Sequence, residues 1–265
     1  MAYNPLSIAS LNSGSNGNCY YVGNDEDAVL VDAGLSCKET EKRMSRLGLS
    51  MDKVRAIFIS HEHTDHIKGL SVLSKKFNLP VYISPGTLKG CKFELRPDLV
   101  RALPSHEAIM VGNLSIIGFP KIHDASEPYS FMVSYGETNV GVFTDLGAVC
   151  EQLTHYFKQC HAAFLETNYD DDLLSKSAYP YFLKQRISGG RGHLSNKQAL
   201  ELFTRHKPNF MSHLLLSHLS KDNNCPDLAA SLFKEHAMET EIIVASRYVE
   251  TAVYTISEPV AVHSF

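Results

Sequence analysis

The clearest chemistry in the chain is a run of three histidines, a glutamate and an aspartate within six residues, at positions 61–66. In an extended segment, residues i and i+2 point to the same side, so His61 and His63 are expected to reach one metal ion. Asp65 and His66 follow where the chain turns into a helical pattern, and we expect them to reach a second ion. Imidazole and carboxylate ligands suit zinc, iron or manganese.

The elements around this run favour a functional site. An apolar stretch at 54–60 predicts a buried strand, and residues from Ile67 onward have helical spacing. The run therefore lies at the carboxyl end of a strand, where α/β folds usually place their chemistry. The alternative is a polar loop that contains histidines by chance, and three histidines with an aspartate in six residues argue against it.

Candidate ligands recur at the ends of other predicted strands. His123, Asp145 and His218 each come after an apolar run, and a random scatter of thirteen histidines would not produce this pattern. Asp32 ends a short apolar stretch at 28–31. It is either a turn residue or a brace that orients the metal-binding histidines, and the nearby histidine run favours the brace.

The order of the predicted elements indicates an α/β fold. Strands alternate with helices in the first third of the chain, and strand-rich halves are separated by helical segments. A helix is predicted over 36–47, with Ser36 as its N-cap, and a helical segment from Asp170 toward Arg186. We expect two sheets packed face to face with helices outside, in one domain over residues 1–265.

Composition sets further limits. No apolar stretch is long enough to span a membrane, and the first residues lack the features of a signal peptide. The six cysteines are widely scattered, which favours reduced thiols and a cytoplasmic location. A net charge of −4 excludes a broadly basic surface, although two divalent ions would make the active cleft locally electropositive.

The strand-end ligands, with Asp32 upstream, resemble the metallo-β-lactamase superfamily over nearly the whole chain. The resemblance implies an αββα sandwich of two mixed sheets with a dinuclear centre. It implies one metal held by His61, His63 and His123, a second held by Asp65, His66 and His218, and a bridge from Asp145. The ions are expected to be zinc, with manganese or iron as alternatives. They would supply a metal-bound hydroxide, which Asp65 would orient.

Three further stretches narrow the resemblance. Residues 11–20, 192–196 and 217–224 together are similar to the YycJ/WalJ-like group, whose members are regarded as DNA exonucleases acting from 5′ ends. The interval between Asp145 and His218 is too short for the inserted domain of β-CASP nucleases. The resemblance thus implies a metal-dependent phosphodiesterase, a 5′ to 3′ DNA exonuclease. The alternatives are tRNase Z-like RNA processing, hydrolysis of a small cyclic phosphodiester or of a thioester or lactone, and a non-catalytic module.

Glu166 and His193 resemble the paired Glu and His of the tRNase Z enzymes. In that group the pair helps to protonate the leaving oxygen, and we assign this role to Glu166 and His193 as a hypothesis. A histidine suits a general acid because it titrates near neutrality. The alternative is that His193 only caps the following helix.

Four cations surround His193 in sequence. They are Lys184, Arg186, Arg191 and Lys197. They either contact the phosphate backbone of a nucleic acid, DNA in the first place, or form a solvated face. No membrane partner is expected, and the sequence leaves open whether the chain forms a homodimer.

Overall fold

Two seven-stranded sheets form the centre of the protein. The computed structural model describes residues 5–257. In the first sheet the strand order is β14-β1-β2-β3-β4-β5-β6. Its strands are β1 (Leu6–Asn12), β2 (Cys19–Gly23), β3 (Ala28–Val31), β4 (Val54–Phe58), β5 (Val81–Ile83), β6 (Val100–Ala102) and β14 (Tyr254–Ile256).

The second sheet has the order β13-β12-β11-β10-β9-β8-β7. Its strands are β7 (Ala108–Val111), β8 (Leu114–Pro120), β9 (Tyr129–Tyr135), β10 (Thr138–Phe143), β11 (Ala162–Glu166), β12 (His213–Ser217) and β13 (Glu241–Val244). Both sheets are mixed, because β3 to β6 and β10 to β13 run parallel while the remaining pairs are antiparallel.

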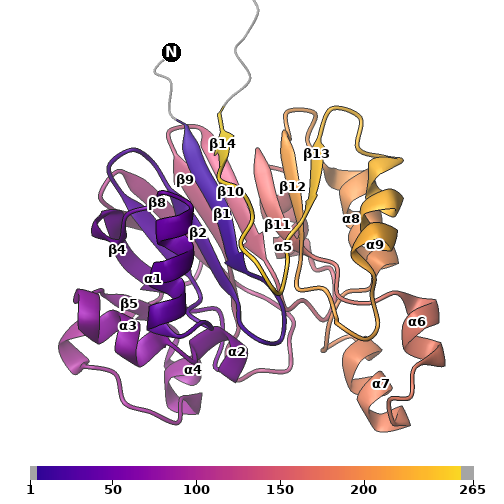
Figure 1. The fold of residues 1–265 in the computed structure, drawn as a ribbon, viewed down its shortest axis with the longest axis horizontal. Coiled ribbons are helices and arrows are strands. Elements are labelled where there is room, and N and C mark those ends of the chain that lie inside the picture. Colours follow the sequence, from indigo (N-terminus) through magenta and orange to yellow (C-terminus); the bar gives the residue numbers. More distant parts are fainter. Residues whose placement is uncertain (1–4, 258–265) are drawn as a thin grey trace, which may run out of the picture.

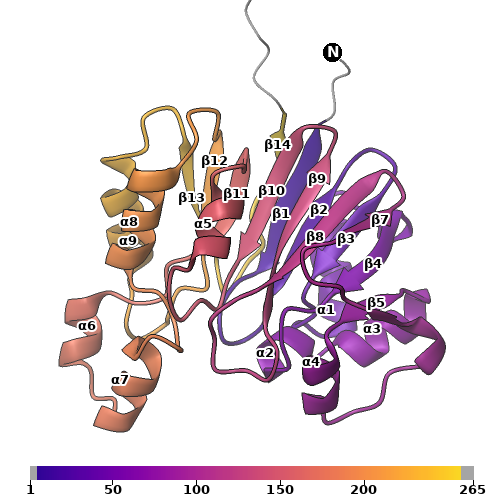
Figure 2. The same ribbon diagram turned by 180° about the vertical axis from the view of Figure 1, so that it is seen from behind.

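Helices cover both outer faces of this pair of sheets (Figure 1). The α-helices are α1 (Cys37–Arg46), α2 (Thr64–Ile67), α3 (Leu70–Phe77), α4 (Pro85–Gly90), α5 (Glu151–Phe157), α6 (Asp171–Lys176), α7 (Tyr181–Ser188), α8 (Asn196–His206) and α9 (Pro226–Lys234). Two short 3-10 helices are η1 (Met51–Lys53) and η2 (Pro97–Leu99). Figure 2 shows the sandwich from behind, where α5 lies against the second sheet.

Three apolar clusters hold these layers together. The central cluster joins the inner faces of the two sheets, with Phe58 of the first packed edge-on against Phe131 of the second. In a second cluster α5, α8 and α9 pack against the outer face of the second sheet, and in a third α1 and α3 pack against the outer face of the first. Burial of an aromatic side chain of this size contributes about 1.5–3 kcal/mol. The predicted αββα sandwich is therefore confirmed.

Parallel strand directions bring chemistry to one edge of the sandwich. Strands β3, β4, β8, β10, β11 and β12 all end on the side of the molecule that carries α2 and α7 (Figure 1). Gly34, just after β3, approaches the Asp65 backbone so closely that a Cβ atom would overlap the Asp65 carbonyl. This contact and the bond from Asn18 N to Asp65 O (2.7 Å) hold the histidine run against the strand ends.

Two helical predictions can be compared with the structure directly. Ser36 caps α1 by accepting a hydrogen bond from Glu39 N, as predicted. The single helical segment from Asp170 toward Arg186 was wrong, because the chain forms α6 and α7 with a break between Ser177 and Pro180. Proline disfavours helical backbone at the residue before it and cannot donate to a helix, which explains the break. No described helix is long and apolar enough to cross a membrane.

Candidate metal centre

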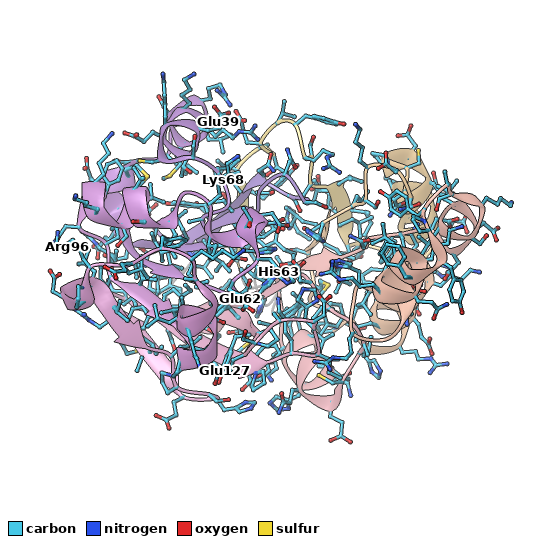
Figure 3. The ribbon with its side chains drawn as sticks, turned by 90° about the horizontal axis from the view of Figure 1, so that it is seen from below. Glu39, Glu62, His63, Lys68, Arg96 and Glu127 are labelled. Carbon is cyan, nitrogen blue, oxygen red and sulfur yellow. The ribbon has the colours of Figure 1, made fainter. Side chains whose placement is uncertain are left out.

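The predicted ligands meet at the shared edge of the two sheets. The histidine run follows β4, while His123, Asp145 and His218 follow β8, β10 and β12 of the other sheet. Figure 3 looks onto this edge and places His63 between the halves contributed by the two sheets. Residues far apart in sequence thus form one cluster, which contains several overlapping sets of donors close enough together to hold a metal ion; two of these sets are called the first and the second group.

The first group consists of imidazoles. The Nε2 atom of His61 lies 2.9 Å from Nδ1 of His63, and Nε2 of His123 lies 3.4 Å from the same atom. Burial lowers the pKa of His61 well below its usual value. Burial also lowers the pKa of His123 to about 4 and outweighs the opposing effect of Asp145. These histidines are therefore neutral at physiological pH, and the neutral imidazole is the form that binds metals.

The second group combines histidines with carboxylates. Nε2 of His66 lies 3.5 Å from Asp65 Oδ2, and Nε2 of His218 lies 3.5 Å from the same oxygen. Asp145 reaches both groups, because its carboxylate oxygens lie 3.1 Å from His66 Nε2 and 3.8 Å from His123 Nε2. Asp145 therefore lies between the two groups.

Unsatisfied polar atoms indicate that the cluster fits cations. Nε2 of His218 and Oδ2 of Asp145 are buried and make no hydrogen bond of good geometry, whereas buried polar groups are normally paired. Burial disfavours the charged form of His218, but Asp145, Asp65 and Glu166 outweigh it and raise its pKa to about 10. The donor set of imidazole and carboxylate suits zinc, iron or manganese, so the residues present fit divalent metal ions.

Further side chains orient these donors. Asp32 Oδ2 lies 2.7 Å from His66 Nδ1, and Asp32 accepts hydrogen bonds from both N and Oγ of Ser60. Asn18 Nδ2 lies 3.0 Å from His66 Nε2 and 3.1 Å from Asp65 Oδ2. Asp32 therefore contacts a proposed metal ligand, His66, at the position predicted for an orienting side chain. Ser60 and Asn18 also contact this region, and neither was identified from the sequence.

Three of these strand ends have left-handed backbone. The φ angles are 63° at Asp32, 56° at Asp145 and 58° at His218. Residues other than glycine rarely adopt this conformation, and such strain is typical of functional sites. The sharp turns aim the three side chains back across the strand ends and toward the cluster.

Glu166 and His193 form a pair beside the second group. Glu166 Oε1 lies 2.7 Å from His193 Nδ1 and 3.0 Å from His218 Nδ1. Its other oxygen accepts hydrogen bonds from the backbone nitrogens of Leu146 (2.5 Å) and Leu194 (3.2 Å). Burial opposes ionisation of Glu166, but the neighbouring histidines lower its pKa to about 2, so it is a carboxylate.

Lys121 is a buried cation that the sequence analysis did not assign. Its Nζ donates to the carbonyl of Thr144, the residue before Asp145, at 2.6 Å. Burial lowers its pKa, while the carboxylates of Asp145 and Asp32 oppose that change. No sequence signal identifies Lys121, because its partner lies 23 residues away on a neighbouring turn.

Replacement of Lys121 tests whether this bond secures the turn that carries Asp145. Lys121→Met keeps the apolar stem but leaves the Thr144 carbonyl without its partner. We expect the free energy of unfolding to fall by about 1–3 kcal/mol, measured by urea titration. Lys68→Met, at an exposed lysine (Figure 3), is the matched control and should change it by less than about 0.5 kcal/mol. Equal stability of both variants would contradict the assignment.

A cleft of about 440 Å³ opens onto the cluster. Its walls come from the metal-site loops on one side and from α7 on the other, where Leu183, Arg186 and Ile187 contribute. His193 also lines it. The cleft is large enough for a ligand of nucleotide size, since ligand pockets measure about 300–1,000 Å³.

The four predicted phosphate contacts do not act alike. Arg186 alone among them lines the cleft, and its Nε donates to Asp124 Oδ2 at 2.6 Å, which joins α7 to the loop that carries His123. Lys184 donates to the carbonyl of Ser175. Arg191 and Lys197 are exposed and lie outside the lining of the cleft. Arg186 is thus the one of the four that lines the cleft, and both interpretations, phosphate contact and solvated face, stay open for these residues.

Comparisons with known proteins agree with this architecture. Residues 27–219 match the family model described as a beta-lactamase superfamily domain. The chain is similar to exodeoxyribonuclease YycJ of Bacillus anthracis, with 34% identity over 84% of this chain and 86% of that protein. It is similar to exodeoxyribonuclease WalJ of Streptococcus pneumoniae, with 32% identity over 83% of both chains.

A solved structure confirms the fold independently of close sequence similarity. The metallo-beta-lactamase fold protein YhfI of Bacillus subtilis superposes with a TM-score of 0.73 over 93% of this chain and 99% of that chain, at 16% identity. Because the family model covers most of the chain and two named relatives exceed 30% identity, the assignment does not depend on the fold alone. The chain belongs to the metallo-β-lactamase superfamily, in the group of YycJ and WalJ, and is a metal-dependent hydrolase.

Proposed function

We propose that this hydrolase is a DNA exonuclease that uses two divalent metal ions and digests from 5′ ends. The observation that carries the proposal is the position of Asp145, within 4 Å of donors in both ligand groups. The names of the relatives support a nucleic acid substrate. The open cleft supports a phosphodiester within a chain rather than a fully enclosed small molecule.

The residues assigned to the two metals follow the two groups of donors. We assign His61, His63 and His123 to one ion, Asp65, His66 and His218 to the other, and Asp145 to both. Two such ions, zinc in the first place, would activate a water molecule and neutralise charge on the phosphate. Asp65 has the further task of orienting the nucleophile, because its carboxylate lies at the rim of the cleft.

The proton for the leaving oxygen is assigned to His193. Glu166 engages Nδ1 of His193, so Nε2 is the remaining ring nitrogen of a side chain that lines the cleft. The contact with the Glu166 carboxylate fixes the orientation of the ring, as an orienting group does for a general acid. His193 then donates its proton to the leaving oxygen as the bond to phosphorus breaks.

Location and domain organisation complete the proposal. We place the protein in the cytoplasm, which its six free cysteines support, because disulfides are rare there. We also propose that residues 1–265 form one domain, since a central apolar cluster contains residues from both sheets.

Digestion of end-labelled DNA tests the function. The purified protein is incubated with 5′-phosphorylated duplex DNA, labelled at either end, in zinc and in manganese. We expect mononucleotides to be released from the 5′ end. Release from the 3′ end would contradict the polarity. Cleavage only of an RNA of the same sequence, or only of a small cyclic phosphodiester, would replace DNA with that substrate.

A further inference from the structure

A second cavity lies directly beside the metal-site cleft. It measures about 310 Å³ and is formed by the loops that follow β1, β12 and β13. Ser220 lines both this cavity and the cleft. Ser13, which also lines the second cavity, accepts a hydrogen bond from the backbone N of His218 at 2.7 Å. The second cavity is thus adjacent to the proposed metal ligands, because Ser13 in its lining is bonded to the backbone of His218.

The wall formed by Arg247 and Tyr248 is fixed through its backbone. Asn16 donates to the carbonyl of Arg247 at 2.7 Å, and the buried guanidinium of Arg43 donates to the carbonyl of Tyr248 at 2.9 Å. Arg43 is itself held by the carbonyl of Leu11 and by Asn12. These bonds hold the backbone of both residues in place beside the cavity that the two residues line.

The side chains on this wall are available to a ligand. Over residues 5–257, Lys221, Arg247 and Tyr248 make no side-chain hydrogen bond and no ion pair, and Tyr248 is 65% exposed. Arg247 lies close enough to Tyr179 to oppose the rise in the pKa of that phenol, which its hydrogen bond to Asp222 causes. Tyr179 lines the metal-site cleft, and Arg247 lines the second cavity.

These groups match the chemistry of a nucleotide. An aromatic ring stacks on any base, and cations follow the phosphates, which is how single-stranded nucleic acids are held without sequence preference. Leu219, Pro226 and Val244 add an apolar surface within the cavity. A volume of 310 Å³ lies at the lower end of the range of ligand pockets, which suits a single nucleotide rather than a duplex.

We propose that the second cavity binds the nucleotide next to the scissile phosphodiester, with its base on Tyr248 and its phosphate on Arg247 and Lys221. The inference depends on the proposed nuclease function and adds a subsite to it. It implies that the substrate strand passes from the metal-site cleft over Ser220, and that this end of the strand is single-stranded where it enters.

Tyr248 variants test the stacking. The ratio of kcat/KM on a single-stranded oligonucleotide to kcat/KM on bis(p-nitrophenyl) phosphate, which is too small to occupy both cavities, is measured for each variant. We expect Tyr248→Ala to lower this ratio about 5- to 100-fold and Tyr248→Phe to restore it. Met238→Ala removes an exposed apolar side chain beyond the end of α9 and should leave the ratio unchanged.

Binding gives a second readout that is independent of turnover. The affinity of a labelled oligonucleotide for the metal-loaded His193→Ala protein is measured by fluorescence anisotropy at several salt concentrations. Adding Arg247→Ala should weaken binding and reduce the slope of log K against log salt by about 0.7, the value for one phosphate contact. An unchanged slope would overturn the role of Arg247.

The outcomes separate this inference from the proposed function. A wild-type protein that degrades the oligonucleotide, together with a Tyr248→Ala protein of unchanged ratio, would overturn the second subsite and leave the nuclease function standing. A wild-type protein that hydrolyses bis(p-nitrophenyl) phosphate but no nucleic acid would overturn the nuclease function and the subsite with it.

Discussion

Replacing Asp145 with alanine is expected to lower hydrolysis by about 10³-fold or more and to reduce the metal content below two ions per chain. The carboxylate lies between both ligand groups, and nearby histidines hold its pKa well below the usual value although burial opposes this. Its removal takes a shared ligand from both ions. A metal pair contributes several kcal/mol to transition-state stabilisation, which corresponds to such a loss. Mass spectrometry for metals and steady-state kinetics check the two effects.

The backbone at Asp145 calls for a second variant. Its φ angle of 56° strains alanine, whereas asparagine tolerates this conformation. Asp145→Asn should therefore keep the fold, judged by circular dichroism, and still lose metal and activity. Asp25→Ala, at an exposed aspartate, is the matched control for loss of a carboxylate. Full metal content and full activity in Asp145→Asn would rule out the bridging role.

Replacing His193 with alanine is expected to lower kcat by about 10²- to 10⁴-fold while both metal ions stay bound. The reason is its position: Glu166 engages Nδ1, and the side chain lines the cleft. His193 also stands close enough to Asp145, Glu166 and His218 to serve as a ligand. Metal content distinguishes these roles, because loss of an ion in His193→Ala would show a ligand and not an acid.

The leaving group provides a sharper test of proton donation. A general acid matters most when the leaving oxygen is a strong base, such as the sugar oxygen of a nucleotide, and least when it is a nitrophenolate. The loss in kcat for His193→Ala should thus be at least tenfold smaller with bis(p-nitrophenyl) phosphate than with DNA. Equal losses on both substrates would point to a structural role for His193.

The sequence predicted those parts of the site that local patterns encode. The histidine run and the strand-end ligands could be found because each follows an apolar stretch, and strand direction alone then brings them together. The fold class followed from the same alternation of strands and helices. The helix predicted toward Arg186 was wrong at Pro180: the acidic residues at 170–172 do begin a helix, but this helix ends at Lys176, before the proline.

The parts that could not be predicted depend on contacts between distant residues. Asn18 meets His66 across 48 positions, and Ser13 meets His218 across 205. Neither the periodicity of apolar residues nor a sequence motif indicates that two such distant residues will be in contact. The left-handed turns at Asp32 and His218 were equally hidden, since no glycine marks them. The role of Lys121 and the second cavity are visible only when the chain is folded.

The division of the proposed ligands between the two sheets has a thermodynamic consequence. His66 follows a strand of one sheet and Asp145 follows a strand of the other, so an ion held by both would cross-link the two halves of the sandwich. A ligand that binds only the folded chain stabilises it by mass action, by about 2.7 kcal/mol at a hundred times its Kd. Metal binding and folding are therefore coupled, and the midpoint temperature of thermal unfolding should rise with the concentration of free zinc. In a cell, the lifetime of this protein would follow the availability of its metal.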